Sequence, residues 1–133
     1  MTITFVIPGI PCAWARARLH GKMHFTPKKQ ESAMVNVQLA AANVMRNYEP
    51  LTGPVRLAVS AVWPWPKSWS AKKRREAGAH YKTSKPDADN VAKLVADALN
   101  GIVWLDDAQV AELRATKQYG LSGATYVTVE ALT

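Results

Sequence analysis

The sequence KPDADNVAKLVADALNGIVWLDDAQV, which runs from Lys85 to Val110, contains every aspartate of this 133-residue chain. Its central part repeats apolar residues at helical spacing, and Asn100-Gly101 follows as a helix end. Asp87 or Asp89 stands at the start of this pattern as an N-cap. The predicted buried face consists of Val91, Leu94, Val95, Ala98 and Leu99. The stretch therefore predicts a core helix with carboxylates at its mouth and the pair Asp106-Asp107 shortly after its end.

Strand patterns surround this helix on both sides. Alternating or β-rich residues predict strands over residues 2–7, 55–62, 111–116 and 125–130. The second of these should stop before the run Trp63-Pro64-Trp65-Pro66, because proline lacks the N–H that a central strand needs for its ladder.

Two further helices are expected. Residues 28–47 carry apolar residues at helical spacing, with Thr26 as N-cap and Pro27 at the first helical position. Residues 71–77 predict a short helix that Ser70 caps and Gly78 ends. Together these elements predict an α/β (α+β) fold, a single compact domain over residues 1–133. In it, a small mixed sheet of about four strands packs with two main helices.

The composition is that of a folded globular protein, with 48% hydrophobic and 20% charged residues. No apolar run approaches the ~20 residues that a membrane helix requires, so no membrane segment is expected. The opening MTITFVIPGIP lacks the charged flank of a secretory signal and is expected to be the first strand. Cys12 is the single cysteine, which excludes an internal disulfide and suits a reducing cytoplasm. We therefore expect a cytoplasmic protein.

The net charge of +7 is unevenly distributed along the chain. Residues 1–86 carry 14 lysines and arginines against 3 acids, whereas residues 87–133 carry 3 against 7. Such asymmetry predicts a face that binds a polyanion beside a pocket that binds a cation.

Two segments concentrate the basic residues. Residues 8–27 predict a long loop or loose hairpin, and residues 67–85 form the most basic stretch. His20 and His24 in the first segment are expected to contact phosphate or solvent, because no Cys and no third His lies at a metal-ligand spacing. The cations predicted to contact nucleic-acid phosphates are Arg16, Arg18, Lys72, Lys73, Arg74, Arg75 and Lys85. Interleaved with the second segment are Trp63, Trp65, Trp69 and Tyr81, which suit either stacking on unpaired bases or anchoring a charged loop to the core.

The aspartates predict a site for a divalent cation. Asp87 and Asp89 flank one residue at the helix mouth, and the returning chain could bring Asp107 alongside them. Three converging carboxylates repel one another unless a cation lies among them, and hard oxygen ligands select Mg²⁺, with Mn²⁺ as a substitute. Lys93, one turn beyond Asp89, could be only an ion-pair partner or could touch a scissile phosphate. Asp97, one turn further, is expected to have a structural role, either in a salt bridge or as a charge on the helix surface. The alternative is that each aspartate only caps a helix or a turn.

Three motifs in this stretch, KPDADNVAK, DALNG and WLDDAQV, closely resemble the RusA family of Holliday junction resolvases, small proteins of bacteria and their phages. The resemblance implies that Asp87, Asp89 and Asp107 are metal-binding catalytic carboxylates and that Lys93 is the catalytic lysine. It also implies a homodimer with two active sites, each cutting one of two opposed strands of a four-way DNA junction.

The expected function is therefore that of a Mg²⁺-dependent, structure-selective endodeoxyribonuclease. It would resolve Holliday junctions by paired strand cleavage in DNA recombination and repair. A first alternative is a non-catalytic, basic nucleic-acid-binding module. A second is a nucleotide-sugar transferase that binds its metal through Asp-x-Asp, although a chain of this length leaves little room for a donor-sugar domain.

Overall fold

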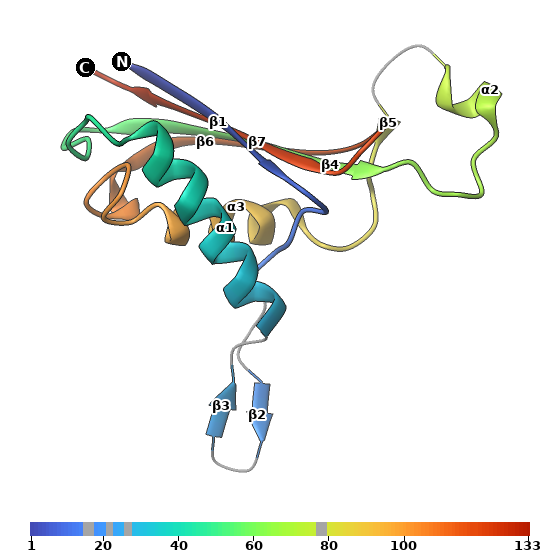
Figure 1. Cartoon of the computed structure of the whole chain (residues 1–133), viewed down its shortest axis with the longest axis horizontal. Helices are drawn as coiled ribbons and strands as arrows, with labels where there is room; N and C mark the ends of the chain where they lie inside the picture. Colours follow the sequence, from blue (N-terminus) through green and yellow to red (C-terminus); the bar gives the residue numbers. More distant parts are fainter. Residues whose placement is uncertain (15–17, 21–22, 26–27, 77–79) are drawn as a thin grey trace.

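The computed structural model describes residues 1–14, 18–20, 23–25, 28–76 and 80–133; of residues 18–20 and 23–25 only the backbone is described. The main body is a five-stranded mixed sheet with α1 (Lys28–Val44) and α3 (Ala88–Ala98) on one face (Figure 1). Its strands follow the order β1 (Thr2–Pro8), β7 (Ala124–Ala131), β4 (Val55–Pro64), β6 (Val110–Gly120) and β5 (His80–Tyr81). The short elements are β2 (Arg18–His20), β3 (Met23–Phe25), α2 (Ala71–Arg74) and the 3₁₀ turn η1 (Asp107–Gln109).

The predicted α+β fold is confirmed, with five strands in the sheet where about four were expected. The additional strand is β5, whose two residues pair with Gln118 and Tyr119 of β6. Two residues are too few to show the alternation on which a strand prediction rests. The core strands were therefore predictable, whereas this edge strand depends on a neighbour that is distant in sequence.

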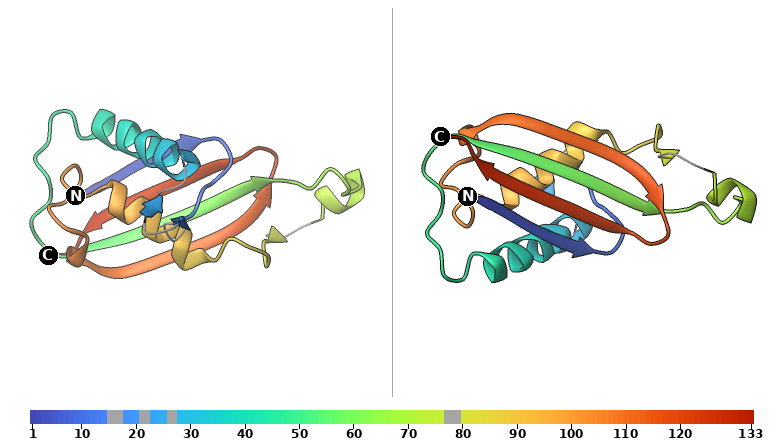
Figure 2. Two further views of the ribbon diagram at one scale, coloured as in Figure 1. Left: turned by 90° about the horizontal axis from the view of Figure 1, so that it is seen from below. Right: turned by 90° about the horizontal axis from the view of Figure 1, so that it is seen from above.

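α3 lies in the connection between two parallel strands. β4 pairs in parallel with β6, whereas the other strand pairs of the sheet are antiparallel. Parallel neighbours need a long crossover connection, and here it contains α3 and η1. α3 consequently packs against β4 and β6, while α1 packs against β1 (Figure 2).

The core lies between the sheet and the inner sides of the two main helices. β4 buries the face that its alternation predicted, which consists of Val55, Leu57, Val59 and Ala61. The predicted apolar face of α3 is likewise buried: Val91, Leu94, Val95, Ala98 and the adjoining Leu99. Each fully buried valine or leucine contributes about 1.5–3 kcal/mol relative to an exposed one. Because α3 is fixed in this way, the polar residues on its outer side are held in defined positions.

β4 continues to Pro64, two residues beyond its predicted end. The prediction was wrong because β4 is central only as far as Val62, which pairs with Ala124 of β7. Trp63 and Pro64 pair with β6 alone. The Trp65 N–H donates to a carbonyl of β6 at 2.8 Å, so the nitrogen of the preceding proline faces the side where β7 has already ended.

The limits of the two main helices lie close to the predicted ones. α1 begins at Lys28 and ends at Val44, three residues before the predicted end; Thr26 and Pro27, its predicted start signals, lie outside the described residues. α3 is followed by Gly101 with φ +78°, a conformation that glycine adopts without strain. The predicted helix end at Asn100-Gly101 therefore agrees with the backbone.

Two parts of the chain project from this body. The β2–β3 hairpin lies within the segment predicted as a long loop or loose hairpin, and it extends on the helix side of the sheet (Figure 1). The arm, defined here as residues 65–76 and 80–82, carries α2 beyond the end of β4 (Figure 2). The opposite face of the sheet is left uncovered by the described helices (Figure 2, right). Within the described ranges, no helix is long and apolar enough to cross a membrane.

Candidate active site

A surface cavity of about 290 Å³ lies between α3 and the start of β6. Asp89 and Lys93 line it from α3, and Asp107 lines it from η1. The remaining lining is apolar and consists of Leu57, Ala92, Ala96, Val110 and Leu113. The structure thus brings three of the four sequence-predicted catalytic residues, two carboxylates and one ammonium, to a single cavity.

The two predicted carboxylates at the start of α3 have different surroundings. Asp87 is the N-cap residue, yet both of its carboxylate oxygens lie 3.1 Å from Nζ of Lys85. Asp89 lies in the first turn, where the helix dipole favours a negative charge, and of the two it is the one that lines the cavity. The Lys85–Asp87 pair is solvent-exposed and therefore contributes little stability, so the carboxylate can exchange partners readily.

The loop before α3 is fastened to β6 by one lysine. Nζ of Lys117 donates hydrogen bonds to the carbonyl oxygens of Ser84 and Pro86, at 2.8 and 2.7 Å. The backbone N–H of Lys82 also donates to the Lys117 carbonyl, at 2.9 Å. Sequence reasoning missed this role because a single lysine in a strand shows no pattern. Lys117 fixes the chain immediately before the Asp-x-Asp motif.

The turn after α3 is held by Gln109. Its Oε1 accepts hydrogen bonds from the N–H groups of Leu105 and Asp106, at 2.9 and 3.0 Å. Its Nε2 donates to the carbonyls of Leu51 and Gly53, both at 2.9 Å. The Gln109 side chain therefore connects this turn to the segment before β4, and it fixes the backbone next to Asp107, the cavity residue of η1.

A third carboxylate, Asp97, adjoins the cavity. Its Oδ2 lies 3.6 Å from Nζ of Lys93, which is the salt bridge, one of the two structural roles that the spacing left open for Asp97. Burial raises the pKa of Asp97, the neighbouring Asp107 carboxyl raises it further, and Lys93 lowers it. The raised pKa therefore reflects mainly the burial of this carboxyl, and in addition the closeness of a second carboxyl, that of Asp107.

Lys93 is placed between an aromatic ring and a carboxylate. Its Nζ lies 4.9 Å from the ring centroid of Trp14, in addition to its contact with Asp97. The backbone N–H of Trp14 donates to the carbonyl of Asn90 at 2.9 Å, and this bond attaches the chain before the hairpin to α3. The ammonium is consequently held at the rim of the cavity while about half of the Lys93 side chain stays exposed.

The donor set fits a hard divalent cation. Among the described residues, no group of three or more His, Cys, Asp or Glu side chains lies close enough to hold a metal on protein ligands alone. Mg²⁺ is usually bound by one or two carboxylates, with water and substrate phosphate completing its shell. Asp89 and Asp107 supply two such carboxylates, and a third, that of Asp97, lies beside Asp107. A metal-binding role for Asp87 stays a prediction.

The predicted DNA-contacting cations lie in three places. Arg16 lies outside the described residues, and Arg18 begins β2, where only the backbone is described. Lys72, Lys73 and Arg75 are exposed on or next to α2, and Lys85 is exposed beside Asp87. Arg74 instead turns back onto the arm, where its Nη2 donates to the Pro66 carbonyl at 3.4 Å.

The tryptophans of the arm pack mainly within it. Trp69 meets the rings of His80 and Tyr119 edge-on at 5.0 and 5.1 Å, and Nζ of Lys73 lies 5.0 Å from its centroid. The guanidinium of Arg74 lies over Trp65 in the same manner, at 5.9 Å. Half-buried rings covered by cations support the anchoring interpretation of these residues over base stacking. Tyr81 differs, since it is 65% exposed.

The predicted helix in the arm is shorter than expected. Ser70 caps α2 as predicted, because its Oγ accepts a hydrogen bond from the Lys73 N–H at 3.1 Å. The helix nevertheless ends at Arg74, not at residue 77, and the predicted stop at Gly78 lies outside the described residues. One turn of helix is long enough to gather basic side chains but too short for a dipole of consequence.

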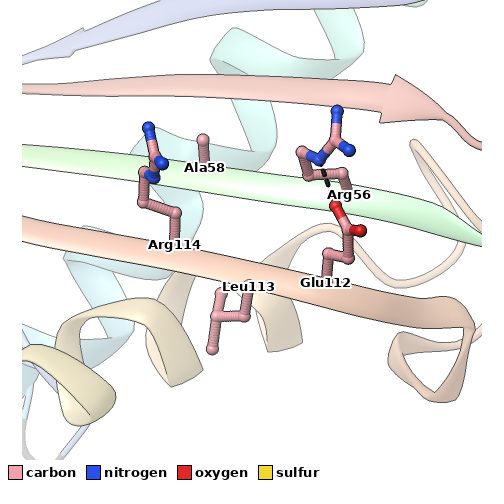
Figure 3. Close-up of a pocket in the computed structure, with 5 residues that line it drawn as sticks. All are labelled: Arg56, Ala58, Glu112, Leu113 and Arg114. Carbon is pink, nitrogen blue, oxygen red and sulfur yellow. Dashed lines mark hydrogen bonds and ion pairs between the residues drawn. The ribbon is translucent and has the colours of Figure 1, made fainter.

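A larger hollow, of about 590 Å³, lies on the uncovered face of the sheet (Figure 3). Its charges oppose each other: Arg56 forms ion pairs with Glu112 and with Glu130, the latter at 2.8 Å. Leu113 points to the other side of the sheet in Figure 3, where it lines the aspartate cavity. The lining contains two cations, Arg56 and Arg114, against the single acid Glu112, and it presents no cluster of carboxylates that could hold a cation. We therefore expect metal-dependent chemistry on the helix side of the sheet.

Comparison with known proteins bears on what this cavity does. A family model described as endodeoxyribonuclease RusA matches residues 8–130, nearly the whole chain. The Bacillus subtilis (strain 168) protein named uncharacterized protein YqaN is 36% identical over 124 residues, a match that covers 88% of this chain and 87% of the relative. The matched range includes the cavity, the hairpin and the arm.

Proposed function

Because this chain belongs to the RusA endodeoxyribonuclease family, we propose that it resolves Holliday junctions by Mg²⁺-dependent, paired strand cleavage in DNA recombination and repair. The observation that supports this most directly is the shared cavity of Asp89, Lys93 and Asp107. Two carboxylates on separate elements can hold one cation, and the lysine adds a positive charge at the same opening. We place the enzyme in the cytoplasm of a bacterium or a phage-infected cell.

The catalytic roles follow from this chemistry. Asp89 and Asp107 would hold the cation, and Asp87 would be a further ligand when its carboxylate is not paired with Lys85. A bound Mg²⁺ supplies an activated water and offsets the charge of the phosphodiester during its displacement. Lys93 contacts the scissile phosphate and stabilises the negative charge that develops on its oxygens. Lys117 and Gln109 hold in place the two segments that carry these carboxylates, through hydrogen bonds to backbone carbonyls.

The DNA is held mainly through its backbone. Lys72, Lys73 and Arg75 on the arm neutralise phosphates, and Lys85 does so next to the cavity. Such contacts give affinity and position but no sequence choice. A four-way junction has two-fold symmetry, so a homodimer with two such sites is the assembly that we propose for paired cleavage.

Asp89→Asn tests the assignment. We expect cleavage of a labelled four-way junction in Mg²⁺ to fall by at least ~100-fold, because the amide is a poor ligand for a hard cation, while junction binding in EDTA changes little. Asp106→Asn is the matched control: it removes a neighbouring charge outside the cavity lining and should cleave like the unchanged protein.

Two results would contradict the proposal. If the unchanged protein binds the junction equally with and without EDTA and nicks it with neither Mg²⁺ nor Mn²⁺, the chain is a non-catalytic binding module. If Asp89→Asn loses junction binding and cleavage together while remaining folded, the carboxylate is structural.

A further inference from the structure

A chain of hydrogen bonds leads from the buried core to the carboxylate of Asp107. Trp104 is fully buried, and its Nε1 donates to Oδ1 of Asn100 at 2.8 Å. Nδ2 of Asn100 lies 3.4 Å from Oδ2 of Asp107, to which it donates in turn. The half-buried carboxylate of Asp107 is thus connected through one amide to Trp104, a fully buried aromatic residue.

The indole fixes the orientation of this amide. An indole N–H only donates, so the Asn100 oxygen must face Trp104, and the amide NH₂ is left to face Asp107. Trp104 cannot turn away, because its ring is packed in the core and its carbonyl accepts the Gly101 N–H at 2.7 Å. The donor presented to Asp107 is therefore preorganised.

The backbone gives no separate reason for asparagine at this position. Asparagine often ends helices because it tolerates a positive φ, yet the positive φ here belongs to Gly101, and no described non-glycine residue has one. The side chain also serves no N-cap, since it follows α3 instead of preceding it. Its two hydrogen bonds are what distinguish it from other residues.

We propose that Asn100 is a positioning residue for Asp107, an inference that rests on the proposed function of the cavity. The neutral amide engages one carboxylate oxygen and leaves the other lone pairs of Asp107 for a cation. It also competes with the neighbouring Asp97 for the orientation of that carboxylate. Groups of this kind, which orient a ligand without touching the metal, typically change metal affinity or activity about 10–100-fold when removed.

Asn100→Ala tests this role with a readout that needs no catalysis. In calorimetric titration with Mn²⁺ alone, we expect the dissociation constant to rise about 10–100-fold. At saturating junction and fixed Mg²⁺, the single-turnover rate should fall to a similar extent, whereas the dissociation constant for the junction in EDTA should stay within about twofold. Wild-type Mn²⁺ affinity in Asn100→Ala would overturn the proposal.

Asn100→Asp separates positioning from simple support of the turn. The carboxylate keeps an acceptor for the Trp104 indole but replaces the donor towards Asp107 with a like charge. If the role is positioning, Asn100→Asp retains its melting temperature yet cleaves well below the wild-type rate. Cleavage at the wild-type rate would show that only the bond to Trp104 matters, and the proposal would fail.

The outcome is independent of whether the protein is a nuclease. If the unchanged protein cleaves no junction but binds Mn²⁺, the proposed function fails, and the Mn²⁺ titration of Asn100→Ala still decides the role of Asn100. If the unchanged protein cleaves and both variants match it, only the positioning role is lost. Trp104→Phe, which keeps an aromatic ring but removes its donor, should show a smaller loss of Mn²⁺ affinity than Asn100→Ala.

Discussion

The acidic cavity and the basic arm use charged side chains in opposite ways. In the cavity, Asp89 and Asp107 belong to the lining, and hydrogen bonds of Lys117 and Gln109 to the backbone hold the two segments that carry them. In the arm, Lys73 and Arg74 lie against the aromatic rings of the same segment. A carboxylate whose backbone is held by other residues remains available to a ligand. A cation that lies over an aromatic ring contributes to the stability of the arm. This difference supports the cavity as the proposed catalytic site. Within the arm, it separates cations that are free to contact DNA from cations, such as Lys73, that also stabilise the fold of the arm.

Of the substitutions considered below, Lys93→Met should produce the largest change, a loss of cleavage rate. Methionine preserves much of the length and the apolar part of the side chain but removes the ammonium beside the cavity, so we expect the single-turnover cleavage rate to fall by about 10²–10³-fold. Junction affinity should change little, since Lys93 supplies one phosphate interaction among many. The measurement is cleavage of a labelled junction at saturating enzyme, with binding followed in Ca²⁺ or EDTA.

Lys72→Met in the arm is its matched control. It removes the same charge from an exposed residue remote from the cavity lining, and its cleavage rate at saturating enzyme should match the wild type. A rate loss of similar size in both variants would mean that charge in general matters and that the cavity lysine has no special role.

The local parts of this architecture were predictable from sequence. The apolar face of α3, the Lys93–Asp97 salt bridge and the Ser70 cap each depend on residues within a turn or two of each other. Their spacing alone determines which side chains meet on a helix. The same holds for the alternation of β4.

The supports of the site could not be predicted in this way, because they join residues that are far apart in the sequence. Lys117 meets Ser84 and Pro86 only because β6 runs beside the loop before α3, and Trp14 meets Lys93 only because the chain before the hairpin docks on that helix. Strand register and loop docking decide such contacts.

Removing the charges of the arm two at a time should have a moderate effect on junction binding. Lys72→Gln with Arg75→Gln removes exposed charges, so the slope of log affinity against log salt should become shallower by about 0.9 for each phosphate that is no longer neutralised. The melting temperature should not change. Junction binding measured across a range of salt concentrations, together with thermal unfolding, provides both quantities.

The contrasting pair is Lys73→Gln with Arg74→Gln. These cations cover Trp69 and Trp65, so their removal should loosen the arm as well as weaken DNA binding. We expect increased proteolysis in the arm for this pair alone. Equal protease sensitivity in both pairs would show that Lys73 and Arg74 do not stabilise the arm more than Lys72 and Arg75 do.

Asp97→Asn should have the smallest effect. We expect it to raise the melting temperature, whereas most substitutions lower it. The pKa of Asp97 is raised above its ordinary value by burial and by Asp107, so the folded protein binds a proton there more tightly than the unfolded chain does. Ionisation of Asp97 therefore costs stability as the pH rises through the raised pKa. The neutral amide avoids this cost, and the metal-free variant should melt a few degrees above the wild type at neutral pH. The difference should shrink as the pH falls through the raised pKa towards the ordinary value, below which Asp97 is protonated in the folded and the unfolded state alike. A lower melting temperature for Asp97→Asn in EDTA at neutral pH would show that its salt bridge with Lys93 outweighs the cost of burying a charged carboxylate beside Asp107.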